Sequence, residues 1–329
     1  MSGSPGAYRQ IGIIGAGAWG TALAIIAAFA GCQVRLWGRN GPRMEEMARR
    51  RSVHPALPGI RLPDAVVPTS ELAEVCTCEA LLLAVPAQHL RSTILAMKPF
   101  VRPGLPAVVC AKGIELESGL LMNEVLQQSA PDLSPAMLSG PSFARDVALG
   151  LPTAVTIAAQ TGIAERLQGA LGSSSFRPYV SDDLIGVALG GAAKNVYAIA
   201  CGIVEGLHLG ESARAALLAR AFAELTRLGE ALGARRETLM GLSGLGDLVL
   251  TATSRTSRNF SRGIAIGERR SGSPHTLAEG VYTAPALVTR AQRHGIELPI
   301  AEAVADILSG NLALELAEAR LMQRPLKAE

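Results

Sequence analysis

The chain has 329 residues, more than a single hydrophobic core comfortably holds, so we expect two domains. Hydrophobic residues make up 49% of the chain and aromatic residues only 4%, which favours a helix-rich α/β enzyme over a β-sandwich. The formal net charge of +3 suits small anionic ligands, and the absence of a dense basic run argues against nucleic-acid binding.

Location and metal content also follow from the composition. Residues 186–204 are long and apolar enough to cross a bilayer, but Lys194 and Asn195 lie at their middle, so we expect no membrane span. The first residues lack the basic start and apolar core of a signal peptide. Cys76 and Cys78 have no companion ligand at zinc spacing, and the five cysteines are too scattered for a disulfide framework. We therefore expect a soluble, cytoplasmic protein without a metal site.

The most informative stretch lies within the first thirty residues. Residues 10–14 form a short Ile-rich run typical of a buried strand, and an Ala-rich helical stretch follows. Between them stand Gly15, Gly17 and Gly20 in the pattern Gly-x-Gly-x-x-Gly, which lets backbone approach a pyrophosphate at the start of a helix. An ordinary glycine-rich turn is the alternative, but the strand and helix on either side favour a dinucleotide site.

The residues after the second predicted strand bear on the choice of cofactor. That strand spans residues 33–37, and at its end a NAD-specific fold usually has an acidic residue that binds the ribose hydroxyls. Here Gly38-Arg39-Asn40 follows, with no acid before Glu45. Arginine can pair with a 2′-phosphate, so NADPH is favoured over NADH, although a surface arginine with no ligand remains the alternative.

Further strands alternate with helices, as a doubly wound parallel sheet requires. We predict buried strands at residues 79–85, 106–110 and 135–139, and two edge strands at 153–158 and 176–180 with a helix between them.

Two of these predicted strands end at groups suited to ligand binding. Ligands of open α/β sheets bind outside the carboxyl ends of the strands. Lys112 follows the strand at 106–110, and the loop of residues 140–144 follows the strand at 135–139. We therefore expect Lys112 and this loop to face the cofactor and its substrate.

The pattern changes near residue 182, after which every predicted element is helical. We place the domains at residues 1–182 and 183–329, with Asp182 or Asp183 capping a helix that runs to about Val204. Lys194 lies on the apolar, glycine-lined face of that helix, where desolvation would lower the pKa of its amine toward an acid/base value. The alternative is a lysine that extends to solvent.

The second domain also contains an acid and a polar helix start. Asp247 follows a glycine-rich run, and we expect it either to cap the helix that it begins or to hold Lys194. Ser257, Arg258 and Asn259 begin the next helix, which by charge and geometry suits a phosphate, or else is polar capping of a surface loop. The last predicted helices span residues 282–294, 299–308 and 312–321.

Six sequence motifs, in this order, resemble the bacterial-type NAD(P)-dependent glycerol-3-phosphate dehydrogenases over nearly the whole chain. They are Gly-Ala-Gly-Ala-Trp-Gly-Thr-Ala-Leu-Ala at 15–24, Ala-Lys-Gly-Ile at 111–114, Gly-Pro-Ser-Phe-Ala at 140–144, Ala-Lys-Asn-Val-Tyr-Ala-Ile at 193–199, Gly-Leu-Gly-Asp-Leu-Val-Leu-Thr at 244–251 and Ser-Arg-Asn at 257–259.

The resemblance implies a Rossmann-type domain followed by an all-α domain like that of 6-phosphogluconate dehydrogenase, in a homodimer. It implies reduction of dihydroxyacetone phosphate to sn-glycerol 3-phosphate for phospholipid synthesis. Lys194 would be the general acid/base, Lys112 would contact substrate and cofactor, and Asp247 would partner Lys194. The residues implied to bind substrate are Lys112, Gly140, Ser142, Lys194, Asp247, Ser257, Arg258 and Asn259. Those implied at the cofactor are Gly15, Gly17, Ala18, Trp19, Gly20, Arg39, Lys112, Ala144, Arg258 and Glu279.

One residue departs from the family pattern, and two other functions stay open. Asp146 stands where the family usually has Glu, so we leave it out of the site. A NADPH-dependent β-hydroxyacid dehydrogenase or ketopantoate reductase is the enzymatic alternative, but its carboxylate substrate fits a phosphate-type anchor at residues 257–259 less well. A NADPH-sensing module without catalysis is the other alternative, and it has no need of a buried Lys194.

Overall fold

The computed structural model describes residues 6–51, 55–270 and 278–317. Backbone contacts divide the chain into two compact units. The first comprises Met1–Lys112 and Leu121–Ala188, and the second comprises Gly113–Leu120 and Leu189–Glu329. The short segment Gly113–Leu120 thus belongs with the second unit although the chain on both sides of it belongs to the first.

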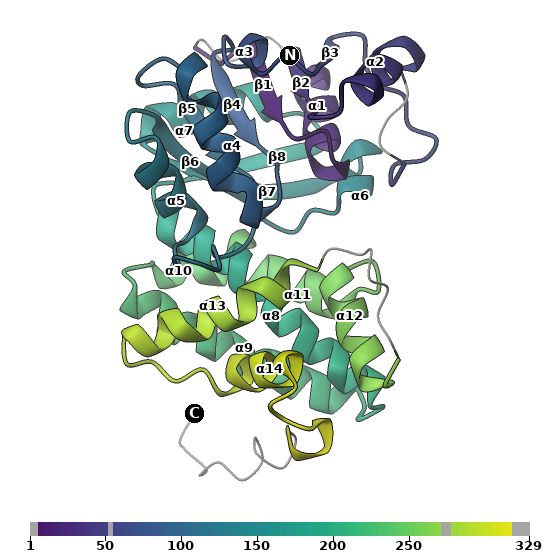
Figure 1. The fold of residues 1–329 in the computed structure, drawn as a ribbon, viewed down its shortest axis with the longest axis vertical. Coiled ribbons are helices and arrows are strands. Elements are labelled where there is room, and N and C mark those ends of the chain that lie inside the picture. Colours follow the sequence, from purple (N-terminus) through teal and green to yellow (C-terminus); the bar gives the residue numbers. More distant parts are fainter. Residues whose placement is uncertain (1–5, 52–54, 271–277, 318–329) are drawn as a thin grey trace. The chain divides into compact units, whose positions relative to one another are not determined.

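The first unit is built on an eight-stranded sheet in the order β3-β2-β1-β4-β5-β6-β7-β8, with helices on both faces (Figure 1). All neighbouring strands run parallel except β6 and β7, which are antiparallel. This sheet confirms the predicted doubly wound α/β fold. The strands are β1 (Gln10–Ile14), β2 (Gln33–Trp37), β3 (Val66–Thr69), β4 (Ala80–Leu83), β5 (Pro106–Val109), β6 (Ser134–Ser139), β7 (Thr153–Ala159) and β8 (Phe176–Ser181).

Helices of two layers cover the sheet, and α1 packs against α6 and α7 while α4 packs against α5. Every residue of β4 and β5 is buried, because a parallel sheet covered on both faces leaves its central strands no access to solvent. The helices are α1 (Ala18–Phe29), α2 (Gly41–Arg50), α3 (Leu72–Val75), η1 (Ala87–His89), α4 (Leu90–Met97), η2 (Lys98–Phe100), α5 (Met122–Ser129), α6 (Ala144–Ala148) and α7 (Thr161–Leu171).

Two details of the sheet differ from the sequence prediction. The short strand β3 was not predicted, because it contains Pro68; it lies at the edge of the sheet, where a missing N–H is tolerated. Of the two strands predicted to be edges, only β8 is one. β7 lies between β6 and β8 and reverses direction relative to β6, which the composition of a strand does not reveal.

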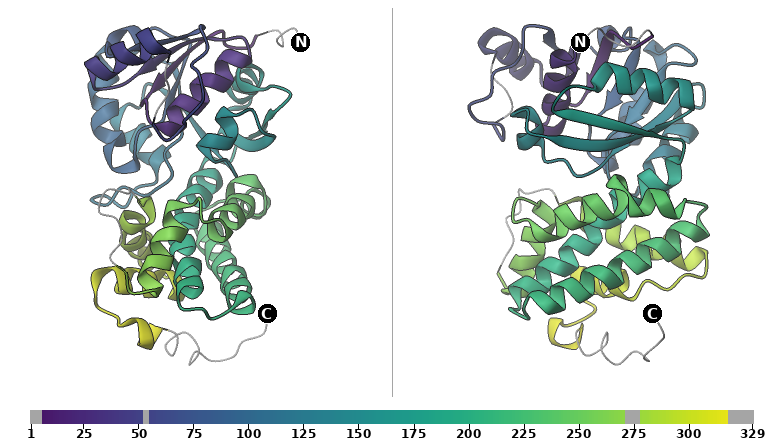
Figure 2. Two further views of the ribbon diagram at one scale, coloured as in Figure 1. Left: turned by 90° about the vertical axis from the view of Figure 1, so that its right-hand side faces the viewer. Right: turned by 180° about the vertical axis from the view of Figure 1, so that it is seen from behind.

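The second unit contains no strand among the residues that the structure describes, which agrees with the predicted all-α domain (Figure 2). Its helices are α8 (Leu184–Gly206), which begins in the first unit, α9 (Glu211–Ala231), α10 (Arg236–Met240), the π turn η3 (Leu242–Gly246), α11 (Asp247–Thr253), α12 (Arg258–Gly267), α13 (Glu279–Arg293) and α14 (Pro299–Ser309). Of the helix predicted at 312–321, residues 314–317 are helical, and residues 318–321 lie outside the described residues.

The long helix α8 is the core of this unit. Its N-terminus is capped as predicted, since the Gly186 N–H donates to the Asp183 carboxylate over 2.7 Å. By length and composition it would span a membrane, but 94% of its apolar window is buried inside the protein. Burial on this scale is typical of a core helix.

Glycines let other backbones approach α8 closely. A Cβ on Gly202 would lie 2.1 Å from the Phe260 carbonyl oxygen of α12, and one on Gly263 would lie 2.1 Å from the Ile199 carbonyl oxygen. Gly206 and Gly267 meet in the same way one turn further along. Two Gly-x-x-x-Gly patterns therefore bring α8 and α12 into backbone contact.

Candidate functional site

The predicted dinucleotide loop has the geometry that its glycines suggest. Gly15 has a φ of +118°, and a Cβ there would lie 2.6 Å from the Ala84 carbonyl oxygen. A Cβ on Gly20 would lie 1.9 Å from the Gly15 carbonyl oxygen, so this glycine is required by the turn itself. Around Gly17, by contrast, there is open space, with nothing within 4 Å of an added Cβ. The loop is tight on its inner side and open where a pyrophosphate would approach.

The start of α1 offers hydrogen-bond donors that fit such a group. No side chain caps this helix and no acidic residue lies in its first turn, so the positive end of its dipole is not neutralised locally. The indole N–H of Trp19 is buried without a partner. Beside this loop, Ala18 is half-buried and Arg39 is exposed just after β2. The residues present therefore fit a dinucleotide.

At the carboxyl ends of β5 and β6, Lys112 forms a hydrogen bond with the loop of residues 140–144, as the next distances show. The Lys112 ammonium donates to the Gly140 carbonyl oxygen over 3.0 Å, and the Ser142 hydroxyl donates to the same oxygen over 2.9 Å. Gly140 has a φ of +147° and lies so close to Val155 that a Cβ would not fit. Ala144 begins α6 beside this loop and is half-buried.

In the second unit the buried Lys194 is paired with an acid. Its ammonium lies 2.5 Å from the Asp247 carboxylate and 2.9 Å from the Thr251 hydroxyl, and the Asp247 side chain is 1% exposed. Of the two roles predicted for Asp247, the structure shows the contact with Lys194, and no side chain caps α11. The alternative of a lysine extending to solvent does not hold.

Thr251 was missed as a partner of Lys194, although the sequence carried a signal. It lies four residues after Asp247, so both side chains project from the same face of α11. The π turn η3 directly before Asp247 was not predicted either. Gly244 makes that turn possible, because a Cβ there would lie 1.9 Å from the Leu239 carbonyl oxygen.

The start of α12 is ordered by its own side chains. The Ser257 hydroxyl accepts a hydrogen bond from the Phe260 N–H over 3.2 Å and so caps the helix. Arg258 is exposed, whereas Asn259 is buried and donates to the Asn195 side chain. Glu279 is the first residue of α13 and is half-buried. The predicted site residues of this unit thus gather on α8, α11, α12 and the first turn of α13.

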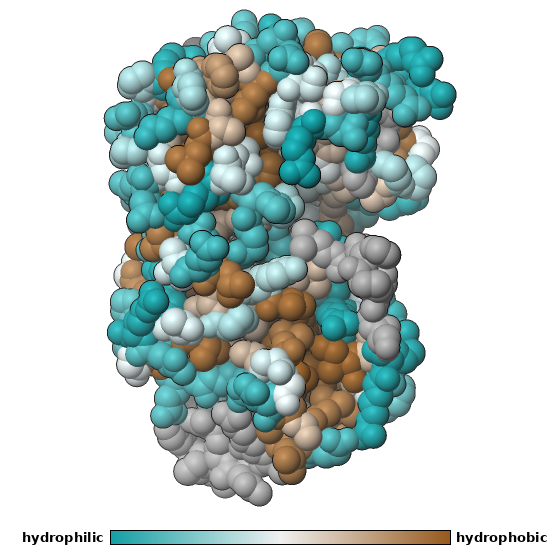
Figure 3. Space-filling model, viewed as in Figure 1, coloured by the Kyte–Doolittle hydropathy of each residue, from teal (hydrophilic) through white to brown (hydrophobic). Residues whose placement is uncertain are grey.

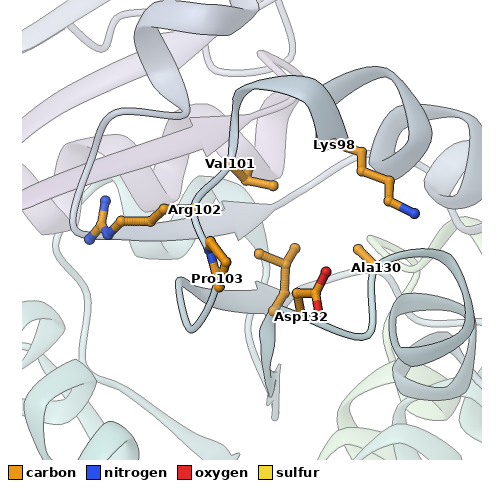
Figure 4. Close-up of a pocket in the computed structure, with 7 residues that line it drawn as sticks. Lys98, Val101, Arg102, Pro103, Ala130 and Asp132 are labelled. Atoms are coloured by element: carbon orange, nitrogen blue, oxygen red, sulfur yellow. The ribbon is translucent and has the colours of Figure 1, made fainter.

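A small cavity in the first unit lies away from the predicted site residues. Its lining residues are Lys98, Val101, Arg102, Pro103, Ala130, Asp132 and Leu133 (Figure 4). They precede β5 and β6, so they lie at the amino ends of the strands, opposite the edge where ligands of such sheets bind. Figure 4 shows Lys98 and Arg102 pointing away from each other, and Arg102 donates to the Cys78 carbonyl oxygen.

Metal ligands do not gather in the part of the chain that the structure describes, where no group of three or more His, Cys, Asp or Glu side chains is arranged to hold an ion. The cysteine thiols of Cys76 and Cys78 are buried, and burial raises the pKa of Cys76 to about 11. A thiol that stays protonated at neutral pH is a poor ligand and a poor nucleophile.

Two family models together cover most of the chain. The model described as NAD-dependent glycerol-3-phosphate dehydrogenase N-terminus matches residues 10–164, and the one described as NAD-dependent glycerol-3-phosphate dehydrogenase C-terminus matches residues 183–318. The chain belongs to this family.

Full-length relatives agree with the family models. A glycerol-3-phosphate dehydrogenase [NAD(P)+] of Parvibaculum lavamentivorans is 53% identical, covering 98% of this chain and 99% of the relative. One of Bradyrhizobium sp. (strain ORS 278) is 54% identical, covering 98% of each chain.

Solved structures separate the family from its enzymatic rival. The glycerol-3-phosphate dehydrogenase of Coxiella burnetii superposes with a TM-score of 0.90 at 37% identity, covering 97% of this chain and all of that one. A ketopantoate reductase of Ralstonia eutropha reaches a TM-score of only 0.60 at 16% identity, covering 94% of this chain and all of that one. The rival shares the fold, whereas the sequence places the chain with the glycerol-3-phosphate dehydrogenases.

Proposed function

We propose that this protein reduces dihydroxyacetone phosphate to sn-glycerol 3-phosphate with NADPH or NADH, supplying glycerophospholipid synthesis. The observation that carries the proposal is the buried Lys194–Asp247–Thr251 cluster in a chain of this family. A ketone that accepts a hydride develops negative charge on its oxygen, and a positioned ammonium both stabilises that charge and donates the proton.

Lys194 is the proposed proton donor to the carbonyl oxygen. The carboxylate of Asp247 and the hydroxyl of Thr251 both lie within hydrogen-bond distance of the ammonium, so they fix its position and direction. In the reverse direction the same amine accepts the proton from the C2 hydroxyl of glycerol 3-phosphate.

Lys112, Gly140 and Ser142 are proposed to contact the substrate, with Lys112 also at the cofactor. Lys112 is already held at Gly140, so its charge is positioned before substrate binds. Ser257, Arg258 and Asn259 are proposed at the phosphate end, where the N–H groups at the start of α12 and an exposed guanidinium suit an anion.

The cofactor is proposed to lie against Gly15, Gly17, Ala18, Trp19, Gly20, Arg39, Lys112, Ala144, Arg258 and Glu279. When bound, NADPH or NADH supplies the hydride. Arg39 supports a preference for NADPH, because its exposed guanidinium stands where an acidic residue would favour NADH.

A homodimer in the cytoplasm is proposed as well. On the face shown in Figure 3, apolar residues gather over part of the helical unit, which suits contact with a second copy. Exposed large apolar side chains in this unit include Leu209, Val249 and Tyr282. Light scattering coupled to gel filtration measures the oligomeric state directly.

A substrate panel tests the function. NADPH oxidation is followed at 340 nm with dihydroxyacetone phosphate, ketopantoate and other 2-ketoacids at equal concentrations. We expect turnover with dihydroxyacetone phosphate and little or none with the ketoacids. A preference for a ketoacid would show that the protein is a hydroxyacid dehydrogenase. NADPH binding without turnover of any ketone would support a sensing module.

A further inference from the structure

The segment that directly follows Lys112 belongs with the second unit. Residues 113–120, which we name the strap, leave the first unit after Lys112 and return to it at Leu121. The first three residues of the strap are buried, and Ile114 is 0% exposed. The strap is therefore packed into the protein at the end that carries a proposed substrate contact.

Two arginines of α13 hold the strap. The Arg290 guanidinium donates to the Gly119 carbonyl oxygen over 3.0 Å, and the Arg293 guanidinium donates to the Ser118 carbonyl oxygen over 3.3 Å. Arg290 is half-buried whereas Arg293 is exposed, so water competes less for the bond of Arg290. Arg290 is thus the firmer of the two anchors.

Hydrogen bonds inside the strap carry this anchor back toward Lys112. The Glu115 N–H donates to the Leu120 carbonyl oxygen over 2.9 Å, and the Gly119 N–H donates to the Glu115 carbonyl oxygen over 2.9 Å. These bonds close the later part of the strap into a small loop, so fixing Gly119 also fixes Glu115. Only two residues, both buried, then lie between this loop and Lys112.

Lys112 itself is held at both ends. Its ammonium donates to the Gly140 carbonyl oxygen over 3.0 Å, and its backbone continues into the strap. Because a lysine side chain is a flexible four-carbon stem, the ammonium keeps its place only if the backbone that carries it also stays in place. A strap released from α13 would let that backbone move.

We propose that Arg290 is a positioning residue: by holding the strap on α13, it fixes the backbone of Lys112 and so the place of the Lys112 ammonium. The inference rests on the proposed function, in which Lys112 contacts substrate and cofactor. A displacement of about 1 Å in a group that orients the substrate costs on the order of 10²-fold in rate. Arg290 itself touches neither ligand in this proposal and acts only through Lys112.

A double-mutant cycle tests whether Arg290 acts through Lys112. We measure kcat/KM for dihydroxyacetone phosphate in wild-type protein, Arg290→Met, Lys112→Met and the double variant. Arg290→Met keeps an aliphatic side chain and removes the donors, and Arg290→Lys restores a donor. Arg236→Met, at an exposed arginine of α10, is the matched control.

Arg290→Met is expected to lower kcat/KM about 10–100-fold in the wild-type background and less than about 2-fold in the Lys112→Met background. Arg290→Lys recovers part of the loss, and Arg236→Met causes none.

Lysine NMR follows Lys112 without any turnover. The chain has only four lysines, so protein labelled with [13C]lysine gives few signals, and the Lys112 signal is the one missing from Lys112→Met. In Arg290→Met this signal is expected to shift, while that of Lys98 in the first unit stays in place. If Arg290→Met does not fold, Arg293→Met removes the weaker anchor at an exposed position, and a smaller shift of the Lys112 signal is expected.

Two results would overturn the proposal. Equal losses of kcat/KM from Arg290→Met in the two backgrounds would show that Arg290 acts independently of Lys112. A lowered melting temperature with an unmoved Lys112 signal would show that the anchor only stabilises the fold. If wild-type protein does not reduce dihydroxyacetone phosphate, the proposed function fails, and the Lys112 signal alone decides whether Arg290 positions this residue.

Discussion

Lys194 shows how the surroundings of one residue suit it to the chemical role proposed for it. A buried ammonium is costly unless it is paired and hydrogen-bonded, and here it is both, with Asp247 and Thr251 as partners. The pair is also vulnerable, because removing one partner leaves the other charge buried and alone.

Lys194→Met tests this assignment by keeping the side-chain volume and removing the proton donor. We expect kcat to fall by about 10²–10⁴, while NADPH affinity measured by fluorescence stays the same. Lys98→Met, at a lysine that lines the cavity at the amino ends of the strands, is the control and leaves kcat unchanged. Near-normal turnover in Lys194→Met would move the catalytic role to Lys112.

Arg39 is the residue on which the proposed preference for NADPH rests. Arg39→Asp removes a charge-assisted contact to the 2′-phosphate and adds a repulsive charge, so NADPH should lose about 1.5–3 kcal/mol of binding free energy. NADH should be affected much less, and kcat/KM for the two cofactors shows the difference. Equal efficiency with both cofactors in the wild-type protein, unchanged by the substitution, would contradict the assignment.

At the scale of elements, the helical unit depends on glycines that bring α8 and α12 together. Gly263→Ala places a methyl group 2.1 Å from the Ile199 carbonyl oxygen, so the helices must separate. We expect a loss of about 1–3 kcal/mol in the free energy of unfolding. Gly162→Ala in α7 meets nothing and should instead stabilise by about 0.5 kcal/mol. Urea unfolding of the two variants gives both values, and equal effects would show that the close approach carries no cost.

A second element-scale feature is the carboxyl group of Glu224, which links α9 to the start of α14. It accepts from the Ile300 N–H over 2.7 Å and from the Ala301 N–H over 3.3 Å, and it faces the Tyr197 hydroxyl of α8 and Arg227 of its own helix. Burial raises the pKa of this carboxyl from 4.5 to about 7, although the two backbone N–H groups and Arg227 oppose the shift.

Because the folded protein holds this proton more tightly than the unfolded chain, the associated stability is complete below about pH 4.5 and is lost as the pH rises through about 7. The loss amounts to at most about 3 kcal/mol. Glu224→Gln should flatten the fall in melting temperature between pH 5 and 8. Glu230→Gln, at an exposed glutamate of the same helix, should leave it unchanged. Identical pH profiles for wild type and Glu224→Gln would refute this account.

Much of this architecture could be predicted from sequence because the signals are local. Apolar runs and glycines indicated β1, β2, β4, β5 and the first helix, and Asp182 or Asp183 indicated the start of α8, where the structure shows Asp183 as the cap. Less accessible were features that depend on distant parts of the chain. The direction of β7, for example, depends on which strand it pairs with. The contact of α12 with α8 and the hydrogen bonds of Asn259 likewise depend on segments far apart in the sequence. The glycines at 202, 206, 263 and 267 show their purpose only when the two helices are seen packed together.

The residues of the candidate site also fall into those that the sequence indicated and those that only the structure revealed. Residue type and motif singled out Lys112, Lys194 and Asp247, and the structure joins Lys194 to Asp247. Identifying Thr251 as a partner of Lys194 also required its four-residue spacing from Asp247 on α11. The hydrogen bonds of the Asn259 side chain with Asn195 and Gly280 could not be predicted from the sequence. A polar residue at a helix start can bind a ligand or form an internal hydrogen bond equally well.

At the scale of the whole molecule, the chain contains a Rossmann-type sheet unit and a helical unit with a buried Lys194–Asp247 ion pair. Each unit has its own group of candidate residues, and the N- and C-terminal family models match mainly the first and the second unit. The related fold of ketopantoate reductases shows that this plan alone does not specify a substrate. We propose that side chains such as Arg258 determine the substrate by binding its phosphate.

The most direct measurement is the stoichiometry of the reaction. Purified protein is mixed with NADPH and dihydroxyacetone phosphate, and the NADPH consumed at 340 nm is compared with the glycerol 3-phosphate formed, identified by NMR. The Lys194→Met protein, prepared in the same way, measures any contaminating enzyme. The account predicts one glycerol 3-phosphate per NADPH and a rate at least about 10² times that of Lys194→Met. Equal rates in the two preparations, or NADPH consumed without glycerol 3-phosphate, would contradict it.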